Sequence, residues 1–249
     1  MTGIVQTSQK RLVLIAGRSH PDLAQHVAKE LGVDLVDTQA YDFANGEIFV
    51  RFEESVRGCD AFVLQSHTEP INKWIMEQLI MVDALKRASA KRITVVVPFY
   101  GYARQDKKHR GREPISARLM ADLFKAAGAD RMMAVDLHTA QIQGFFDGPV
   151  DHLTAMPVLC DYMAGLGDDL VVVSPDAGRV KLNKKFASKI GAELAILETA
   201  ALIHRRFGPD ALPNYVPEAT LDNGLAGTFP VPITVVPGHL SIEEILSLA

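Results

Sequence analysis

Short apolar runs, rich in β-branched residues, alternate with longer segments of helical periodicity along most of this chain. This alternation constrains the fold more than any other feature, because continuous apolar runs of strand length are typical of strands buried on both faces of a parallel sheet. The chain is therefore predicted to be an α/β protein with mainly parallel sheets. The expected strands are LVLIAG at 12–17, AFVLQS at 61–66, ITVVVP at 93–98, RMMAVD at 131–136, LVVVS at 170–174 and AELAILE at 192–198.

The helices between these strands are marked by proline near the first turn and by glycine just beyond the last residue. The clearest example begins with Pro21 and is followed by Gly32. Further helices are expected at 72–89, 114–127 and 179–190.

Residues 147–157 interrupt the alternation with one glycine and two prolines, and a second α/β series follows them. We therefore expect two domains, an N-terminal α/β domain at 1–150 and a C-terminal α/β domain at 151–249. Beyond 198 the rhythm is lost until the tail at 232–249, where a last strand and a last helix are expected.

Charge and cysteine content exclude several kinds of partner and site. A net charge of -4 over 249 residues argues against nucleic acid or an anionic membrane as the partner, because proteins that bind these carry a broad basic excess. Cys59 and Cys160 are the only cysteines and lie far apart, so neither a disulfide framework nor a zinc site is indicated. No signal sequence is visible and no apolar stretch reaches the roughly 18 residues of a membrane span. We expect a cytoplasmic protein.

The segment YGYARQDKKHRGREPIS, at 100–116, concentrates positive charge directly after an expected strand. Only Asp106 and Glu113 oppose its cations, which are Arg104, Lys107, Lys108, Arg110 and Arg112. Several guanidinium and ammonium groups together can hold a triphosphate, and ligands of open α/β sheets bind beyond the carboxyl ends of strands. A solvated, salt-bridged loop would have the same composition. The residues alone leave both interpretations open.

Two further segments that follow expected strands offer metal ligands. VDLHT, at 135–139, places Asp136 and His138 where an imidazole and a carboxylate can coordinate or orient Mg2+. SPDAGRV, at 174–180, adds Asp176 at the start of an expected helix, a position that favours anions. A structural hydrogen bond for the histidine and a helix cap for the aspartate remain open as alternatives.

The segment FANGEIFVRF, at 43–52, contains Asn45-Gly46, a strong signal for the turn of a β-hairpin. Its phenylalanine, Phe43, can either stack on a base or belong to the core. A plain surface hairpin explains the pattern equally well.

Together these segments resemble the ribose-phosphate pyrophosphokinase family, also called phosphoribosyl pyrophosphate synthetases. The resemblance is nearly continuous from about Leu12 to Leu197, and four ordered motifs of this length are very specific. It implies two similar phosphoribosyltransferase-type α/β domains. It also implies a reaction in which the 1-hydroxyl of ribose 5-phosphate attacks the β-phosphorus of Mg-ATP, so that the diphosphate is transferred whole and AMP leaves.

The resemblance also assigns roles to residues of this chain. Phe43, Asn45 and Glu47 would contact the adenine of an ATP held largely by a neighbouring subunit. Arg104 and Gln105 would hold adenosine and phosphates, with Arg104 in a catalytic role.

Further implied roles concern the metal, the loop and the assembly. His138 and Asp176 would be catalytic through Mg2+, while Asp106 and Lys107 would begin a loop near the nucleotide and regulatory sites. The family forms homo-oligomers, in which dimers stack into hexamers, and phosphate or ADP serve as effectors.

After Leu197 the sequence departs from the family pattern. A basic catalytic loop and an acidic strand followed by a ribose-phosphate loop are expected there, and neither is found; Glu198 and Thr199 stand at the start of this region. Compared with the family, the second domain is therefore expected to be shortened. The leading hypothesis is the synthetase. The alternative is a non-catalytic family member that binds nucleotide and regulates or co-assembles with an active synthetase. A plain phosphoribosyltransferase is disfavoured, because it would need the missing loop and would not use the ATP-side motifs.

Overall fold

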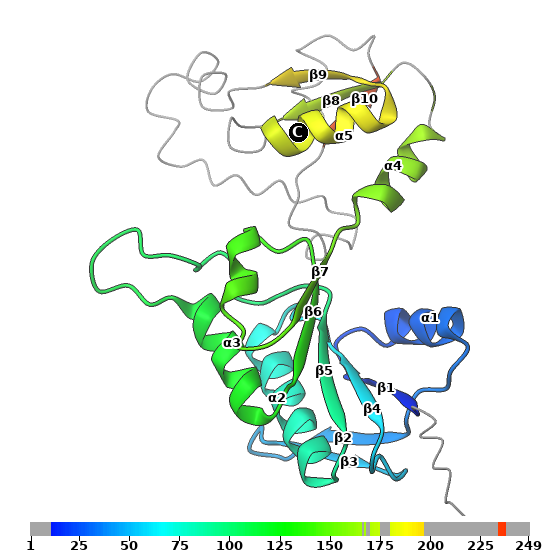
Figure 1. The fold of residues 1–249 in the computed structure, drawn as a ribbon, viewed down its shortest axis with the longest axis vertical. Helices are drawn as coiled ribbons and strands as arrows, with labels where there is room; N and C mark the ends of the chain where they lie inside the picture. The colour runs from blue at the N-terminus through cyan, green and yellow to red at the C-terminus, as the bar shows by residue number, and fades with distance from the viewer. Residues whose placement is uncertain (1–10, 166, 168–169, 175–179, 197–233, 238–249) are drawn as a thin grey trace, which may run out of the picture. The chain divides into compact units, whose positions relative to one another are not determined.

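The chain divides into two compact units, Met1–Leu153 and Thr154–Ala249. A computed structural model describes residues 11–165, 167, 170–174, 180–196 and 234–237 (Figure 1). Each unit contains its own sheet and its own core, and each is described separately below.

The first unit is built on a five-stranded, fully parallel sheet with the strand order β1-β4-β5-β6-β7. Its elements along the chain are β1 (Leu12–Ala16), α1 (Pro21–Leu31), β2 (Thr38–Asp42), β3 (Ile48–Phe52), β4 (Asp60–Leu64), α2 (Ile71–Arg87), β5 (Arg92–Val97), α3 (Ser116–Ala127), β6 (Arg131–Val135), the 3-10 helix η1 (Ala140–Gly144) and β7 (Val150–Leu153). The prediction of an α/β chain with a mainly parallel sheet is therefore confirmed.

Helices cover this sheet from both sides (Figure 1). α2 and α3 pack on one face, where Ile75, Val82 and Leu85 of α2 are buried in the core. On the other face, Ala24 and Ala28 of α1 pack against β1 and β4. Two-sided burial explains why the central strands read as unbroken apolar runs.

Strand β7 was not expected, because its sequence VDHL lies between interrupting residues and has two polar residues, Asp151 and His152, at its centre. It pairs in parallel with β6, with His152 opposite Ala134, and forms one edge of the sheet. An edge strand with a partly exposed face does not need a continuous apolar run.

The expected turn at Asn45-Gly46 is confirmed as the end of an antiparallel hairpin of β2 and β3, in which Asp42 lies opposite Ile48. Gly46 has φ 87°, a left-handed conformation that favours glycine.

The second unit contains α4 (Met156–Ala164), β8 (Leu170–Ser174), α5 (Val180–Ile190), β9 (Glu193–Ile196) and β10 (Thr234–Pro237). β9 runs parallel to β8, and β10 pairs with the other edge of β8 in the antiparallel direction. The strand expected in the tail is confirmed as β10, whereas the helix expected after it lies outside the described residues.

No helix in the described parts of the chain is both long enough and apolar enough to cross a membrane.

A buried histidine joins the sheet to the segment that follows β5. His67 is fully buried; its Nδ1 accepts the backbone N–H of Gly101 at 3.0 Å, and its Nε2 lies 2.9 Å from Gln78 Oε1. The acceptor role of Nδ1 places the ring proton on Nε2, which donates to Gln78. Gln78 in turn donates to the carbonyl of Val63 at 2.9 Å. Burial lowers the pKa of His67 to about 4.

This burial predicts a specific pH dependence of stability. Because the ring is neutral in the folded chain and has its ordinary pKa when unfolded, the unfolded state binds the extra proton between pH 6.5 and about 4. The His67 contribution to the free energy of unfolding is complete above pH 6.5 and falls by about 3 kcal/mol as the pH drops through this window. Denaturant unfolding at several pH values measures it.

The matched variant is His67→Asn, whose side-chain oxygen can still accept the Gly101 N–H but does not titrate. The variant should lose this part of the pH dependence. The same slope in both proteins would show that His67 is not the group responsible.

Candidate functional site

The carboxyl ends of β1, β4, β5 and β6 lie along one edge of the first sheet, because these strands are parallel and adjacent. The segments that leave this edge include the cationic loop after β5 and the VDLHT segment after β6. Open α/β sheets bind ligands at such an edge. The structure thus brings two of the predicted segments to neighbouring strand ends.

The cationic loop, residues 104–113, is fixed at its base. Gln105 donates its backbone N–H to the carbonyl of Tyr102 at 2.9 Å and accepts the N–H of Ala117 at 3.1 Å. Tyr102, just before the loop, and Arg112, near its end, have φ values of 63° and 70°. Left-handed backbone at residues other than glycine is strained and is often found at functional sites.

The outer part of the loop exposes its cations. All five side chains, Arg104, Lys107, Lys108, Arg110 and Arg112, are exposed, and the ion pairs among the described residues include none of them. Glu113 instead accepts the backbone N–H groups of His109 and Arg110, at 2.7 and 3.0 Å, and these bonds lower its pKa. Hydrogen bonds of its backbone N–H groups to Glu113 therefore fix the conformation of the loop, while the side chains of its cations face solvent.

The segment that carries His138 is held by the edge strand β7. Asp136 has φ 44° and donates its N–H to the carbonyl of Leu153 at 3.0 Å. The next N–H, of Leu137, donates to Nε2 of His152 at 2.9 Å. Two consecutive peptide groups are thus fixed just before His138, which is half-buried.

Asp106 joins these two segments. Its carboxylate is almost completely buried and accepts hydrogen bonds from Thr139 Oγ1 at 2.6 Å and from Gln141 Nε2 at 3.1 Å. The hydrogen bond from Thr139 is the main cause that lowers the pKa of Asp106, and the nearby charge of His138 adds to it. The expectation that Asp106 is among the nucleotide contacts stays a prediction. In the structure its carboxylate links the cationic loop to the His138 segment.

The turn at 43–47 has a defined shape of its own. Phe43 donates its N–H to the carbonyl of Glu47 at 2.7 Å, and Glu47 donates its N–H to Asn45 Oδ1 at 3.1 Å. Phe43 is 46% exposed and meets Tyr41 edge to face, with ring centroids 5.4 Å apart. It is therefore available for stacking and is not a core residue.

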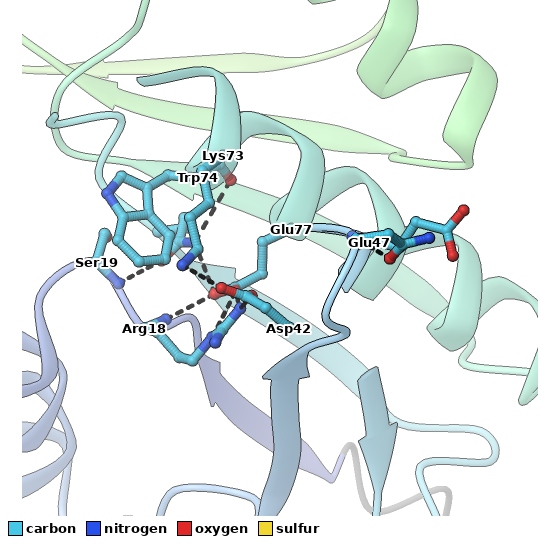
Figure 2. A network of polar contacts seen from close by, with 9 residues as sticks. Arg18, Ser19, Asp42, Glu47, Lys73, Trp74 and Glu77 are labelled. Carbon is cyan, nitrogen blue, oxygen red and sulfur yellow. Dashed lines mark hydrogen bonds and ion pairs between the residues drawn. The ribbon is translucent and has the colours of Figure 1, made fainter. Parts of the chain in front are cut away.

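A polar network at the ends of β1 and β2 was not predicted (Figure 2). Arg18, which follows β1, contacts Glu77 of α2 through its backbone N–H at 2.8 Å and its Nε at 2.6 Å. Asp42, at the end of β2, accepts hydrogen bonds from Arg18 at 2.7 Å and from Lys73 at 2.6 Å. We call Arg18, Asp42, Lys73 and Glu77 the Arg18 network.

A signal for this network exists in the sequence. Glu77 stands four residues before Met81 and eight before Leu85, on a stripe of α2 that is buried in the core. A carboxylate in that position must find a partner.

The last predicted site residue, Asp176, lies outside the described residues. Among the residues that are described, no group of three or more histidine, cysteine, aspartate or glutamate side chains is arranged to hold a metal. What the sheet edge does assemble is a solvent-facing set of cations beside an imidazole, which suits a polyphosphate ligand.

Comparison with known proteins agrees with this geometry. Residues 12–128 match the family model of the N-terminal domain of ribose phosphate pyrophosphokinase. The ribose-phosphate pyrophosphokinase of Streptomyces coelicolor is 64% identical over 212 residues, which cover 84% of this chain and 64% of that protein. That of Mycobacterium tuberculosis is 60% identical over 222 residues, covering 88% of this chain and 66% of that protein. The chain thus spans just under two thirds of the length of these curated relatives.

A solved structure shows the same relationship. The crystal structure of phosphoribosylpyrophosphate synthetase from Mycobacterium smegmatis matches with a TM-score of 0.71 and 67% identity, over 75% of this chain and 64% of that chain. Sequence, fold and the set of residues at the sheet edge lead to one conclusion. Residues 12–128 of this chain form the N-terminal domain of the ribose-phosphate pyrophosphokinase family.

Proposed function

We propose that this chain transfers the diphosphate group of ATP to the 1-hydroxyl of ribose 5-phosphate, giving phosphoribosyl pyrophosphate and AMP. The observation that carries the proposal is the pair of hydrogen bonds by which Thr139 and Gln141 hold Asp106. They join the cationic loop and the His138 segment into one surface at the carboxyl edge of the sheet. Membership of a family whose curated relatives are named for this activity supports the proposal.

In the proposed reaction, the 1-hydroxyl oxygen of the sugar forms a bond to the β-phosphorus of ATP and gives up its proton. The bond from that phosphorus to the oxygen bridging the α- and β-phosphates breaks, and AMP carries this oxygen away. Such transfers depend mainly on positioning and on neutralisation of phosphate charge. Arg104, Gln105 and Lys107 are the proposed nucleotide contacts, with Arg104 also stabilising the departing AMP, and Asp106 anchors the loop that carries them.

Mg2+ is the proposed cofactor, and His138 and Asp176 are its proposed protein ligands. Magnesium that travels with a nucleotide is usually held by one or two protein groups together with substrate phosphates. The His138 segment is fixed at this edge, and the described residues contain no group of three or more side chains that could hold a metal. Both observations are compatible with that mode of binding. When bound, the ion would neutralise phosphate charge.

The assembly is part of the proposal. Phe43, Asn45 and Glu47 would contact the adenine of a nucleotide held by a neighbouring copy, in homodimers that stack into hexamers. The hydrogen bonds and ion pairs of the described residues do not join this turn to the cationic loop of its own chain, which agrees with separate roles. Phosphate or ADP are the proposed effectors. The second unit is proposed to have a phosphoribosyltransferase-type fold. The protein is proposed to act in the cytoplasm.

The proposed reaction predicts that purified protein releases AMP from ATP only when both ribose 5-phosphate and Mg2+ are present. Chromatographic separation of AMP, ADP and ATP measures this directly, and chelation of the metal should abolish the release. AMP formation without the sugar phosphate would contradict the proposal. Binding of Mg-ATP with no AMP in the complete mixture would favour the non-catalytic, regulatory alternative.

The anchoring role of Asp106 predicts the effect of Asp106→Ala. Thr139 and Gln141 lose their shared acceptor, which should lower the free energy of unfolding by about 1–3 kcal/mol. The cationic loop is then no longer fixed beside the His138 segment, so the KM for ATP should rise about tenfold, equivalent to roughly 1.4 kcal/mol.

Asp122→Ala is the matched control. It removes a carboxylate that is paired with Arg118 on the exposed surface of α3. This control should change the KM for ATP by less than about twofold, because exposed pairs within a helix contribute little. Equal KM values for Asp106→Ala and the unmodified protein would refute the anchoring role.

A further inference from the structure

The Arg18 network has an unusual arrangement of charge. Glu77 is completely buried, and its carboxylate is compensated by the backbone and side chain of Arg18 and by Gln65 Nε2 at 3.0 Å. A buried carboxylate is tolerated only when it is paired and hydrogen-bonded. The buried carboxylate of Glu77 therefore fixes the position of the Arg18 guanidinium.

The other end of the guanidinium reaches the hairpin. Arg18 and Lys73 occupy one oxygen each of Asp42, with distances of 2.7 Å to Oδ1 and 2.6 Å to Oδ2. Both hydrogen bonds lower the pKa of Asp42, and the one from Lys73 has the larger effect. Asp42 is the last residue of β2, so a single carboxylate ties the hairpin to the end of β1 and to the first turn of α2 (Figure 2).

An aromatic ring accompanies both cations. Arg18 lies 5.9 Å and Lys73 lies 4.9 Å from the centre of the Trp74 ring, within the range of cation–π attraction. The indole N–H of Trp74 donates to the carbonyl of Glu69 at 3.1 Å, which fixes the ring. Trp74 is the single tryptophan of the chain.

The hairpin needs such a connection. Two-stranded hairpins are marginally stable by themselves. Near its base, Ala40, Val50 and Phe52 pack against the main core, whereas near its tip Tyr41 and Phe43 are exposed. The orientation of the turn at 43–47 therefore depends on Asp42, which lies directly beside it.

We propose that Arg18 and Lys73, supported by the buried Glu77, are positioning residues that orient the 43–47 turn for its nucleotide contact through Asp42. This inference rests on the proposed function for the identity of the ligand. The orienting role itself is a property of the free chain and is testable without nucleotide.

Asp42→Asn is the variant of choice. It keeps the shape of the side chain and leaves the Arg18–Glu77 contact intact, so the buried carboxylate stays paired. Asp83→Asn is the control, because Asp83 accepts a hydrogen bond from Arg87 on the exposed side of the same helix, α2. The full-length chain is used throughout.

Two readouts on the free protein test the orienting role. In Asp42→Asn, amide hydrogen exchange in the peptide that covers residues 43–52 should speed up at least tenfold, and the fluorescence emission of Trp74 should change as its cations are released. Asp83→Asn should match the unmodified protein in both. Unchanged exchange and emission in Asp42→Asn would overturn the proposal.

A kinetic readout separates positioning from general structural damage. In Asp42→Asn the KM for ATP should rise about tenfold, while kcat and the KM for ribose 5-phosphate stay within about twofold. A fall in kcat with an unchanged KM for ATP would overturn the nucleotide half of the inference. If the unmodified protein neither binds nor uses ATP, the proposed function fails, whereas the exchange and fluorescence results still decide the orienting role.

Discussion

Several polar side chains at the carboxyl edge of the first sheet are almost completely buried, and the exposed surface beside them depends on how they are hydrogen-bonded. They include Gln65, His67, Glu77 and Gln78. Buried polar groups without partners are costly, so each one dictates the position of the groups that it binds. Gln65 accepts the N–H of Ser19, and Glu77 accepts the N–H of Arg18, which fixes the chain where it leaves β1. His67 fixes Gly101 just before the cationic loop.

This buried layer explains how one sheet edge carries two different surfaces. The cationic loop and the His138 segment meet through Asp106, and their exposed groups suit the phosphates of a nucleotide. The 43–47 turn is oriented separately through Asp42 and the Arg18 network. In both places a carboxylate of the chain restrains a nearby loop or turn, while the residues proposed to meet the ligand remain exposed.

Much of the fold could be predicted from the sequence, because its signals are local. Unbroken apolar runs such as ITVVVP identified strands buried on both faces, and Asn45-Gly46 identified the hairpin turn. β7 escaped prediction because an edge strand needs no such run. For the site, the sequence identified the exposed cations and His138 but not the residues that hold them. The contacts of Asp106 with Thr139 and of Arg18 with Glu77 join residues 33 and 59 positions apart, and periodicity carries no information about such pairs.

We propose that the sheet edge after β5 and β6 forms one nucleotide-binding surface. Amide hydrogen exchange of the whole chain, recorded with and without Mg-ATP, distinguishes one shared surface from separate ones. If they form one surface, residues 100–113 and 136–141 should become protected together, with the same dependence on ATP concentration. Protection confined to another part of the chain, or no protection of either segment at saturating Mg-ATP, would contradict it.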